Sequence, residues 1–187
     1  MSAQLNNNNS PLPLTSTQIA AITGSPVENV RLYWPLIVNE LERETIDDRF
    51  VQIAVLATIA VEDPVFKPID ERGTLEYFTK MYEHRKDLGN VFPGDGARYH
   101  GRGFIQLTGR TNYYTFSALT GSDLMQDPDL ALNPVMSARI LAVYFKTHHI
   151  AEAARSQDWK KVRFLVNGGL TDFGRFILIV QRLLAAS

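Results

Sequence analysis

Two glutamates of the sequence have the residue type and the setting that acid–base chemistry needs. Glu62 ends the most apolar predicted helix, 50–62, where burial and the negative end of the helix dipole both disfavour the ionised carboxyl. A carboxyl that stays protonated can act as a general acid, for example toward a glycosidic oxygen. Glu83 closes a short predicted helix and precedes three basic residues. Position alone also allows simpler roles: a solvated helix end for Glu62 and a surface ion pair for Glu83.

A glycine-rich segment, 84–109, supplies further polar side chains. Its central part reads Tyr-His-Gly-Arg-Gly-Phe-Ile-Gln-Leu-Thr from Tyr99 to Thr108. Thr108 and Asn112 are four residues apart, so they share a helix face if a helix starts at Thr108. The segment lacks the third glycine and the Lys-Ser/Thr of phosphate-binding loops, which excludes a nucleotide site of that kind. An irregular segment of this length in a compact domain is usually functional.

These residues resemble glycoside hydrolase family 19, which comprises chitinases and the related lysozyme-like endolysins of bacteriophages. The likeness covers roughly residues 50–185 and follows the chain in order. The matching stretches are 57–62, 82–90 with 93–96, 99–108, 127–130, 144–145 and 166–170, followed by Arg175. The sequence of 82–96 is similar to that of the endolysin branch.

The resemblance implies a role for each matched position. Glu62 would be the general acid, and Glu83 would be the general base that activates water for inversion at the anomeric carbon. Thr108 matches a hydroxyl that helps to hold this water, and Arg175 matches an arginine near the second carboxylate. The positions that match sugar-binding or orienting residues are Gln106, Asn112 and Asn167. An inverting pair of carboxyls lies roughly 6.5–9.5 Å apart.

Two positions beside the expected acid depart from the family pattern. Val61 stands where the family commonly has His, and Asp63 stands where it has Thr or Ser. Asp63 adds a negative charge next to Glu62, which further disfavours its ionised form. The aromatic residues that flank the glycine-rich segment, Tyr99 and Tyr113, are expected to line the substrate cleft.

Helical periodicity dominates the rest of the chain, so the sequence predicts a mainly α globule with an irregular, glycine-rich active-site wall, and the family resemblance implies that this globule is lysozyme-like. Ser25, Pro26 and Glu28 predict a capping box at the start of a helix that kinks near Pro35. Asp47 or Asp48 is expected to cap the central helix. The predicted helices are 18–22, 27–41, 50–62, 75–83, 110–120, 134–146, 150–155, 159–166 and 171 to the end.

The predicted organisation is a disordered lead-in, 1–13, and one catalytic domain, 14–187. Within this domain we expect an N-terminal helical subdomain, 14–46, and a family 19-like core, 47–187. The lead-in is rich in Asn and Pro and offers little to bury. We expect a monomer.

Composition excludes several classes of protein. There is no cysteine, so disulfide scaffolds, thiolate metal sites and cysteine nucleophiles are excluded. A net charge of −1 argues against a nucleic-acid partner. His148-His149 is expected to contact helix-terminal carbonyls rather than a metal, and neither metal nor organic cofactor is expected. Lys160, Lys161 and Arg163 are expected to form a solvated helix face, with contact to an anionic wall as the alternative.

The sequence thus predicts an inverting glycoside hydrolase that cleaves β-1,4 bonds of an N-acetylated amino-sugar polymer. We expect bacterial peptidoglycan as the substrate; chitin or chito-oligosaccharides remain the alternative, and a catalytically silent wall-binding module is a third. Neither a signal peptide nor a stretch long enough for stable membrane insertion is recognisable. We therefore expect synthesis in the cytoplasm and action at the cell wall after release.

Overall fold

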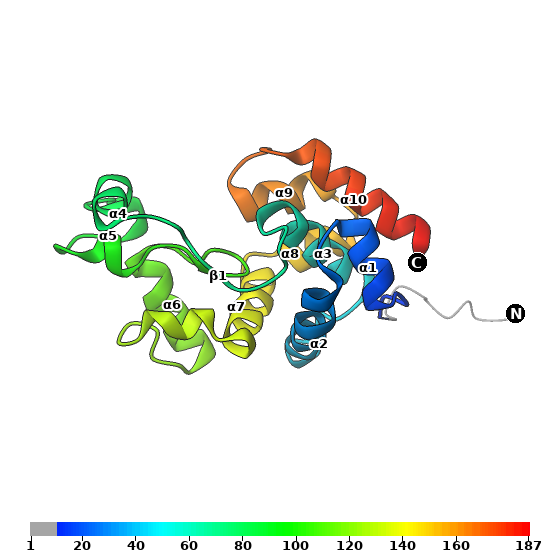
Figure 1. The fold of residues 1–187 in the computed structure, drawn as a ribbon, viewed down its shortest axis with the longest axis horizontal. Coiled ribbons are helices and arrows are strands. Elements are labelled where there is room, and N and C mark those ends of the chain that lie inside the picture. Colours follow the sequence, from blue (N-terminus) through cyan, green and yellow to red (C-terminus); the bar gives the residue numbers. More distant parts are fainter. Residues whose placement is uncertain (1–10) are drawn as a thin grey trace, which may run out of the picture. The chain divides into compact units, whose positions relative to one another are not determined.

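The computed structural model describes residues 11–187, which form α-helices α1–α10, the short 3-10 helices η2 and η3, and two short strands (Figure 1). The predicted mainly α class is confirmed. The chain divides into two compact units. Unit 1 consists of two stretches of the chain, the part that ends at Phe66 and Tyr144–Ser187. Unit 2 is Lys67–Val143. The expected subdomain boundary at residue 46 therefore falls inside unit 1.

Unit 1 is built around one apolar helix. Its complete helices are α1 (Ser16–Thr23), α2 (Val27–Arg43), α3 (Arg49–Glu62), α8 (Ile150–Arg155), α9 (Trp159–Asn167) and α10 (Phe173–Ala186). Every residue of α3 from Phe50 to Ala60 is buried, and this helix packs against α1, α8, α9 and α10. Because α3 is apolar on all sides, only a central position hides its whole surface from water. The prediction of a central helix is confirmed.

Local polar contacts fix both ends of α3. At its start, the Asp48 side chain accepts the Val51 N–H and pairs with Arg155 at 2.7 Å. At its end, Asp63 is buried and its carboxylate accepts the Val65 N–H at 3.1 Å. The expectation of a cap at Asp47 or Asp48 is confirmed, with Asp48 as the cap. These contacts place Glu62, the last residue of α3, at a defined point.

The start of unit 1 departs from the sequence prediction in two places. The residue that caps α2 is Pro26, which makes no side-chain capping bond, so the capping box expected at Ser25 is wrong. A capping box is found instead at α1, between Thr15 and Gln18. The expected lead-in 1–13 lies largely outside the described residues. Leu12, within it, is buried and donates its N–H to Gln52 of α3 at 3.1 Å.

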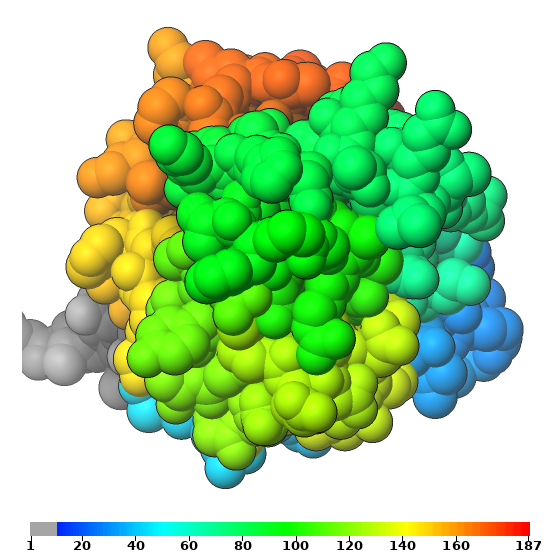
Figure 2. All heavy atoms as spheres, turned by 90° about the vertical axis from the view of Figure 1, so that its left-hand side faces the viewer, coloured from blue at the N-terminus to red at the C-terminus, as the bar shows by residue number. Residues whose placement is uncertain are grey.

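Unit 2 consists of short elements. These are β1 (Ile69–Asp70), α4 (Leu75–Tyr82), η2 (Lys86–Leu88), α5 (Asp95–Arg98), β2 (Arg102–Gly103), α6 (Arg110–Thr120) and η3 (Pro128–Leu132). α7 (Pro134–Thr147) starts in this unit, and its last turn belongs to unit 1. The segment 84–109, expected to be irregular, contains η2, α5 and β2. Figure 2 shows the surface that α4, α5 and α6 contribute, in green.

The two strands pair antiparallel and bring distant parts of unit 2 together. Ile69 is opposite Gly103, and Asp70 is opposite Arg102. Gly103 has a φ of +86°, and a Cβ there would lie 2.9 Å from the Ala131 carbonyl oxygen, so only glycine fits without movement. Arg102 is buried and donates to Asp129 at 2.9 Å. Sequence reasoning missed this pairing because two-residue strands leave no periodic pattern.

Among the residues that the structure describes, no helix is long and apolar enough to cross a membrane.

Candidate active site

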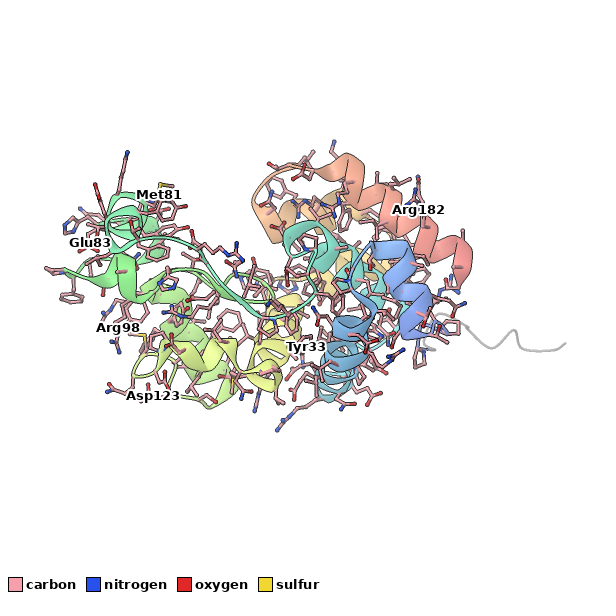
Figure 3. All side chains as sticks on the ribbon, in the orientation of Figure 1. Tyr33, Met81, Glu83, Arg98, Asp123 and Arg182 are labelled. Atoms are coloured by element: carbon pink, nitrogen blue, oxygen red, sulfur yellow. The ribbon has the colours of Figure 1, made fainter. Side chains whose placement is uncertain are left out.

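Glu83 occupies a built anion site in unit 2. It follows α4 directly, and its backbone leaves the helical conformation there. The Gly94 N–H donates to Oε1 at 2.6 Å and the Gly96 N–H donates to Oε2 at 2.8 Å. These two hydrogen bonds hold the pKa of Glu83 below its usual range, because they stabilise the carboxylate. Glu83 is labelled in Figure 3, next to Met81 at the end of α4. A half-buried carboxylate that stays ionised can accept a proton, and its lowered pKa makes it a weaker base than an unperturbed glutamate.

The loop that binds Glu83 is itself fixed by a buried acid. Asp95 accepts the N–H groups of Val91 and Phe92 at 3.0 and 2.9 Å and pairs with Arg110 at 2.8 Å. A Cβ on Gly96 would lie 2.7 Å from the Glu83 backbone nitrogen, so glycine is required for the close approach of the two segments. The positions of the two donor N–H groups thus depend on Asp95 and Gly96.

Gln106, Thr108 and Asn112, which the sequence predicted as site residues, are linked by hydrogen bonds. The Thr108 hydroxyl donates to the Gln106 carbonyl at 2.8 Å, and the Asn112 amide donates to the Thr108 carbonyl at 2.7 Å. The Gln106 amide donates to the carbonyls of Ile69 and Gly103 at 3.0 Å each. Helix α6 starts at Arg110, so Thr108 is next to the helix instead of on it. The structure still brings the three residues together.

Glu71, which sequence reasoning did not single out, joins this group. A Cβ on Gly101 would meet Gln106 Oε1 at 2.8 Å, Glu71 Oε2 at 3.1 Å and Thr108 Oγ1 at 3.3 Å, so these three oxygens converge on one glycine. The carboxylate also accepts from the Gly101 N–H at 3.0 Å and from the Tyr82 hydroxyl at 2.8 Å. Burial, and then this bond to Glu71, raise the pKa of Tyr82, the residue before Glu83.

Glu62, in unit 1, contacts a buried arginine. The Arg163 guanidinium donates from Nη1 to Glu62 Oε1 and from Nε to the Thr171 carbonyl at 2.8 Å. Arg163 is 1% exposed, whereas the Glu62 side chain is 31% exposed. Because Arg163 is buried against the Glu62 carboxyl, the expectation that this basic residue lies on a solvated face is wrong.

Asn167 and Arg175 belong to the same unit. Asn167 is the last residue of α9 and is exposed; Gly168 then ends the helix in the left-handed conformation. Arg175 is exposed in the first turn of α10, and it has no ion-pair partner within the described part of the chain. Its expected position near the second carboxylate stays a prediction.

Comparison with known proteins finds curated relatives and solved structures that are similar to this chain. A Haemophilus influenzae protein named glycosyl hydrolase family 19 domain-containing protein is 34% identical over 108 residues, which are 58% of this chain and 52% of that protein. The chain therefore spans about half the length of this relative. No family model matches the sequence. The chain resembles glycoside hydrolase family 19.

The fold agrees with this family resemblance. The crystal structure of chitinase C from Streptomyces griseus matches with a TM-score of 0.61 and 16% identity, covering 93% of this chain and 78% of the other. The structure of a chitinase C mutant matches with a TM-score of 0.60, 15% identity and the same coverage. At these identities the likeness shows the fold alone. The predicted resemblance to family 19 and the predicted fold class are both confirmed.

Two residues that were expected to line the cleft because they flank the glycine-rich segment are in the core of unit 2. Tyr99 is 2% exposed, and Tyr113 is fully buried and donates to the His100 carbonyl at 3.0 Å. Burial raises the pKa of Tyr113 to about 12. Because their rings pack against each other with centroids 5.2 Å apart, the structure corrects these two residues from cleft lining to packing. Helical spacing could not separate the two roles.

His100 in unit 2 and His148 in unit 1 make structural contacts. The His100 ring stacks on Phe78 with centroids 4.2 Å apart, and its nitrogens contact Ala97 and Asp70. In unit 1, His148 contacts the Tyr144 carbonyl at 3.1 Å, as the sequence predicted for a helix end. Over residues 11–187, no group of three or more His, Asp or Glu side chains is placed to hold a metal ion.

Proposed function

We propose that the protein is a glycoside hydrolase that cleaves β-1,4 bonds of an N-acetylated amino-sugar polymer with inversion. The observation that carries the proposal is the carboxylate of Glu83, which two backbone N–H groups hold in its ionised form. In this mechanism Glu83 removes a proton from water while the water oxygen bonds to the anomeric carbon. Glu62 gives its proton to the leaving oxygen as the glycosidic bond breaks.

The other site residues support these two steps. The hydroxyl of Thr108 is proposed to help to hold the attacking water. Gln106 and Asn112 in unit 2 and Asn167 in unit 1 are proposed to bind the N-acetylated sugars. Arg163, which contacts Glu62 Oε1, is proposed to hold this carboxyl in position. No step requires a cofactor.

We propose bacterial peptidoglycan as the substrate, and therefore action at the cell wall. The support is the likeness of 82–96, which contains Glu83 and its anion site, to the endolysin branch of the family. Chitin is the second candidate, because the solved structures with this fold are of chitinase C. The two polymers share the N-acetylglucosamine scaffold, so the two catalytic carboxyls alone do not distinguish between them.

The test measures reducing ends released from purified peptidoglycan and from colloidal chitin. Glu62→Gln and Glu83→Gln should each lower the rate about 100-fold or more, since general acids and bases contribute factors of this size. Glu76→Gln is the matched control, because Glu76 is an exposed acid on α4, the helix that Glu83 directly follows. NMR of soluble oligosaccharides should show the α-anomer first. Full turnover by both variants, or an initial β-anomer, contradicts the mechanism.

A further inference from the structure

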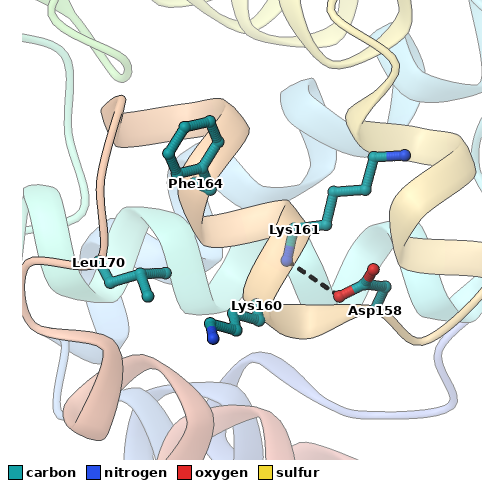
Figure 4. A pocket seen from close by; sticks show the side chains of 5 residues that line it. All are labelled: Asp158, Lys160, Lys161, Phe164 and Leu170. Carbon is teal, nitrogen blue, oxygen red and sulfur yellow. Dashed lines mark hydrogen bonds between the residues drawn. The ribbon is translucent and has the colours of Figure 1, made fainter.

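An open hollow of about 360 Å³ lies beside α9 in unit 1 (Figure 4). It is lined by Asp158, Lys160, Lys161, Phe164 and Leu170. Its volume falls in the range of clefts that bind small ligands. All five residues come from α9, the residue that caps it or the loop that follows it, so the hollow is formed by one short stretch of chain.

The hollow combines two apolar side chains with two free cations. Phe164 is 54% exposed and Leu170 is 41% exposed, although large apolar side chains are usually buried. Over residues 11–187, neither Lys160 nor Lys161 has an ion-pair partner. The acid at the site, Asp158, is engaged in capping: it accepts the Lys161 backbone N–H at 3.0 Å, the dashed bond in Figure 4.

The two lysines are not equivalent. In Figure 4 the Lys160 side chain extends on the same side of α9 as Leu170, whereas the Lys161 side chain extends away from it. Lys161 also borders a neighbouring hollow with His149 and Glu152. Lys160 is thus the cation best placed to act together with the apolar side chains.

The hollow continues along the helix to a proposed sugar-binding residue. Lys160, Phe164 and Asn167 are spaced four and three residues apart, so they follow one another along a single face of α9. The face spans roughly 10 Å from the first to the last, about two sugar rings. A glycan strand bound at Asn167 would carry its substituents along this face.

We propose that this face of α9 is a subsite for the carboxylate-bearing peptide of peptidoglycan, with Lys160 binding the carboxylate and Phe164 and Leu170 contacting the aliphatic parts. The inference rests on the proposed function and names the group that would separate peptidoglycan from chitin. Chitin is neutral and carries no such peptide, so it offers nothing to an ammonium group. A lysine acts here as a point charge, which suits a flexible peptide.

The test is co-sedimentation of the full chain with peptidoglycan and with colloidal chitin, which reads binding and does not need turnover. Lys160→Gln should weaken binding to peptidoglycan about threefold, and the double variant Lys160→Gln/Lys161→Gln about tenfold, with binding to chitin unchanged. Phe164→Ala should also weaken peptidoglycan binding selectively. Arg182→Gln is the matched control, since it removes one exposed positive charge from α10 of the same unit (Figure 3).

Salt gives a second readout. Raising the ionic strength should weaken peptidoglycan binding by the unaltered chain more than by the double variant, because screening acts on the exposed charges. Equal losses on both polymers, or no loss on peptidoglycan, would overturn the inference. Failure of the proposed function appears differently, as absence of reducing ends from either polymer by the unaltered chain.

Discussion

At the residue scale, the low pKa of Glu83 predicts the pH dependence of catalysis. The N–H groups of Gly94 and Gly96 lower this pKa, so the base stays ionised until the pH falls below the usual range for a glutamate, about 4.3. Activity that needs the ionised base is present above the folded-state pKa and is lost as the pH falls through it. We expect the acidic limb of kcat/KM below about pH 4.3, measured on a soluble chito-oligosaccharide. A limb well above this value would assign the base elsewhere.

Gly96 offers a direct test of the anion site around Glu83. In Gly96→Ala the new Cβ would approach the Glu83 backbone nitrogen to 2.7 Å, so the two segments must separate. The hydrogen bond from the backbone N–H of residue 96 to Glu83 Oε2 then lengthens. We expect a loss of activity of about tenfold or more and an upward shift of the acidic limb. Gly174→Ala is the control, because a Cβ there meets nothing within 4 Å. An unchanged pH profile in Gly96→Ala would show that this hydrogen bond does not set the pKa.

The ion pair of Glu62 predicts a combined effect on stability and activity. Arg163→Met removes a buried guanidinium that binds both Glu62 and the Thr171 carbonyl. We expect the free energy of unfolding to fall by about 2 kcal/mol, since the hydrogen bonds of a buried guanidinium are lost, and catalysis to weaken as Glu62 loses its support. Urea unfolding and reducing-end release check the two effects. Arg163→Lys keeps the charge and should retain more of both; a variant of full stability would contradict the structural role.

At the scale of elements, helix positions were predictable from the sequence because most helices are amphipathic or apolar and end at clear signals. The range 110–120 predicted for α6 agrees with the structure, as does 150–155 for α8. The errors fall where local rules compete. Ser25 is a good N-cap residue, but Pro26 caps α2, and side-chain type alone did not decide between them. Short elements such as β1 and α5 contain too few residues for a periodic pattern.

Of the candidate site, the sequence could predict the residues of the matched motifs but not their supports. Glu71, Asp95 and Arg163 act through contacts 30, 15 and 101 residues away along the chain, to Gly101, Arg110 and Glu62. Such separations leave no local pattern. The burial of individual side chains could not be predicted from the sequence either: Tyr99 and Tyr113, which were expected in the cleft, lie in the core. A lone buried arginine in a basic run also looks like a surface residue until the fold is known.

The cap of α3 can be tested as an element. Asp48 both caps the helix and pairs with Arg155 at 2.7 Å, so Asp48→Ala removes two contacts of a buried carboxylate. We expect a loss of about 1–2 kcal/mol and a fall in Tm of roughly 3–6 °C. Asp48→Asn keeps a capping oxygen and should lose less. Equal losses in the two variants would show that the ion pair, and not the cap, stabilises this end of α3.

At the scale of the whole molecule, the two units are stabilised in different ways. Unit 1 encloses α3, whose residues from Phe50 to Ala60 are all buried, and four helices pack on it. In unit 2, residues 84–94 are mostly exposed and include the Gly94 N–H that donates to Glu83, whereas Tyr99, Phe104 and Leu107 of the same glycine-rich segment are buried. The proposed acid belongs to unit 1 and the proposed base to unit 2.

This difference predicts a gradient of hydrogen exchange along the chain. The amides of α3 can exchange only when the surrounding helices unfold, whereas those of the mostly exposed residues 84–94 exchange through local openings that expose little apolar surface. Exchange measured by mass spectrometry should therefore be slowest in α3 and faster by at least about tenfold in 84–94. A chito-oligosaccharide bound to Glu83→Gln should slow exchange in 84–94 more than in α3, because ligand binding stabilises the segment that contacts it. If 84–94 exchanges as slowly as α3 without ligand, its hydrogen bonds form a rigid element, and the proposed substrate would meet a site that is already fixed.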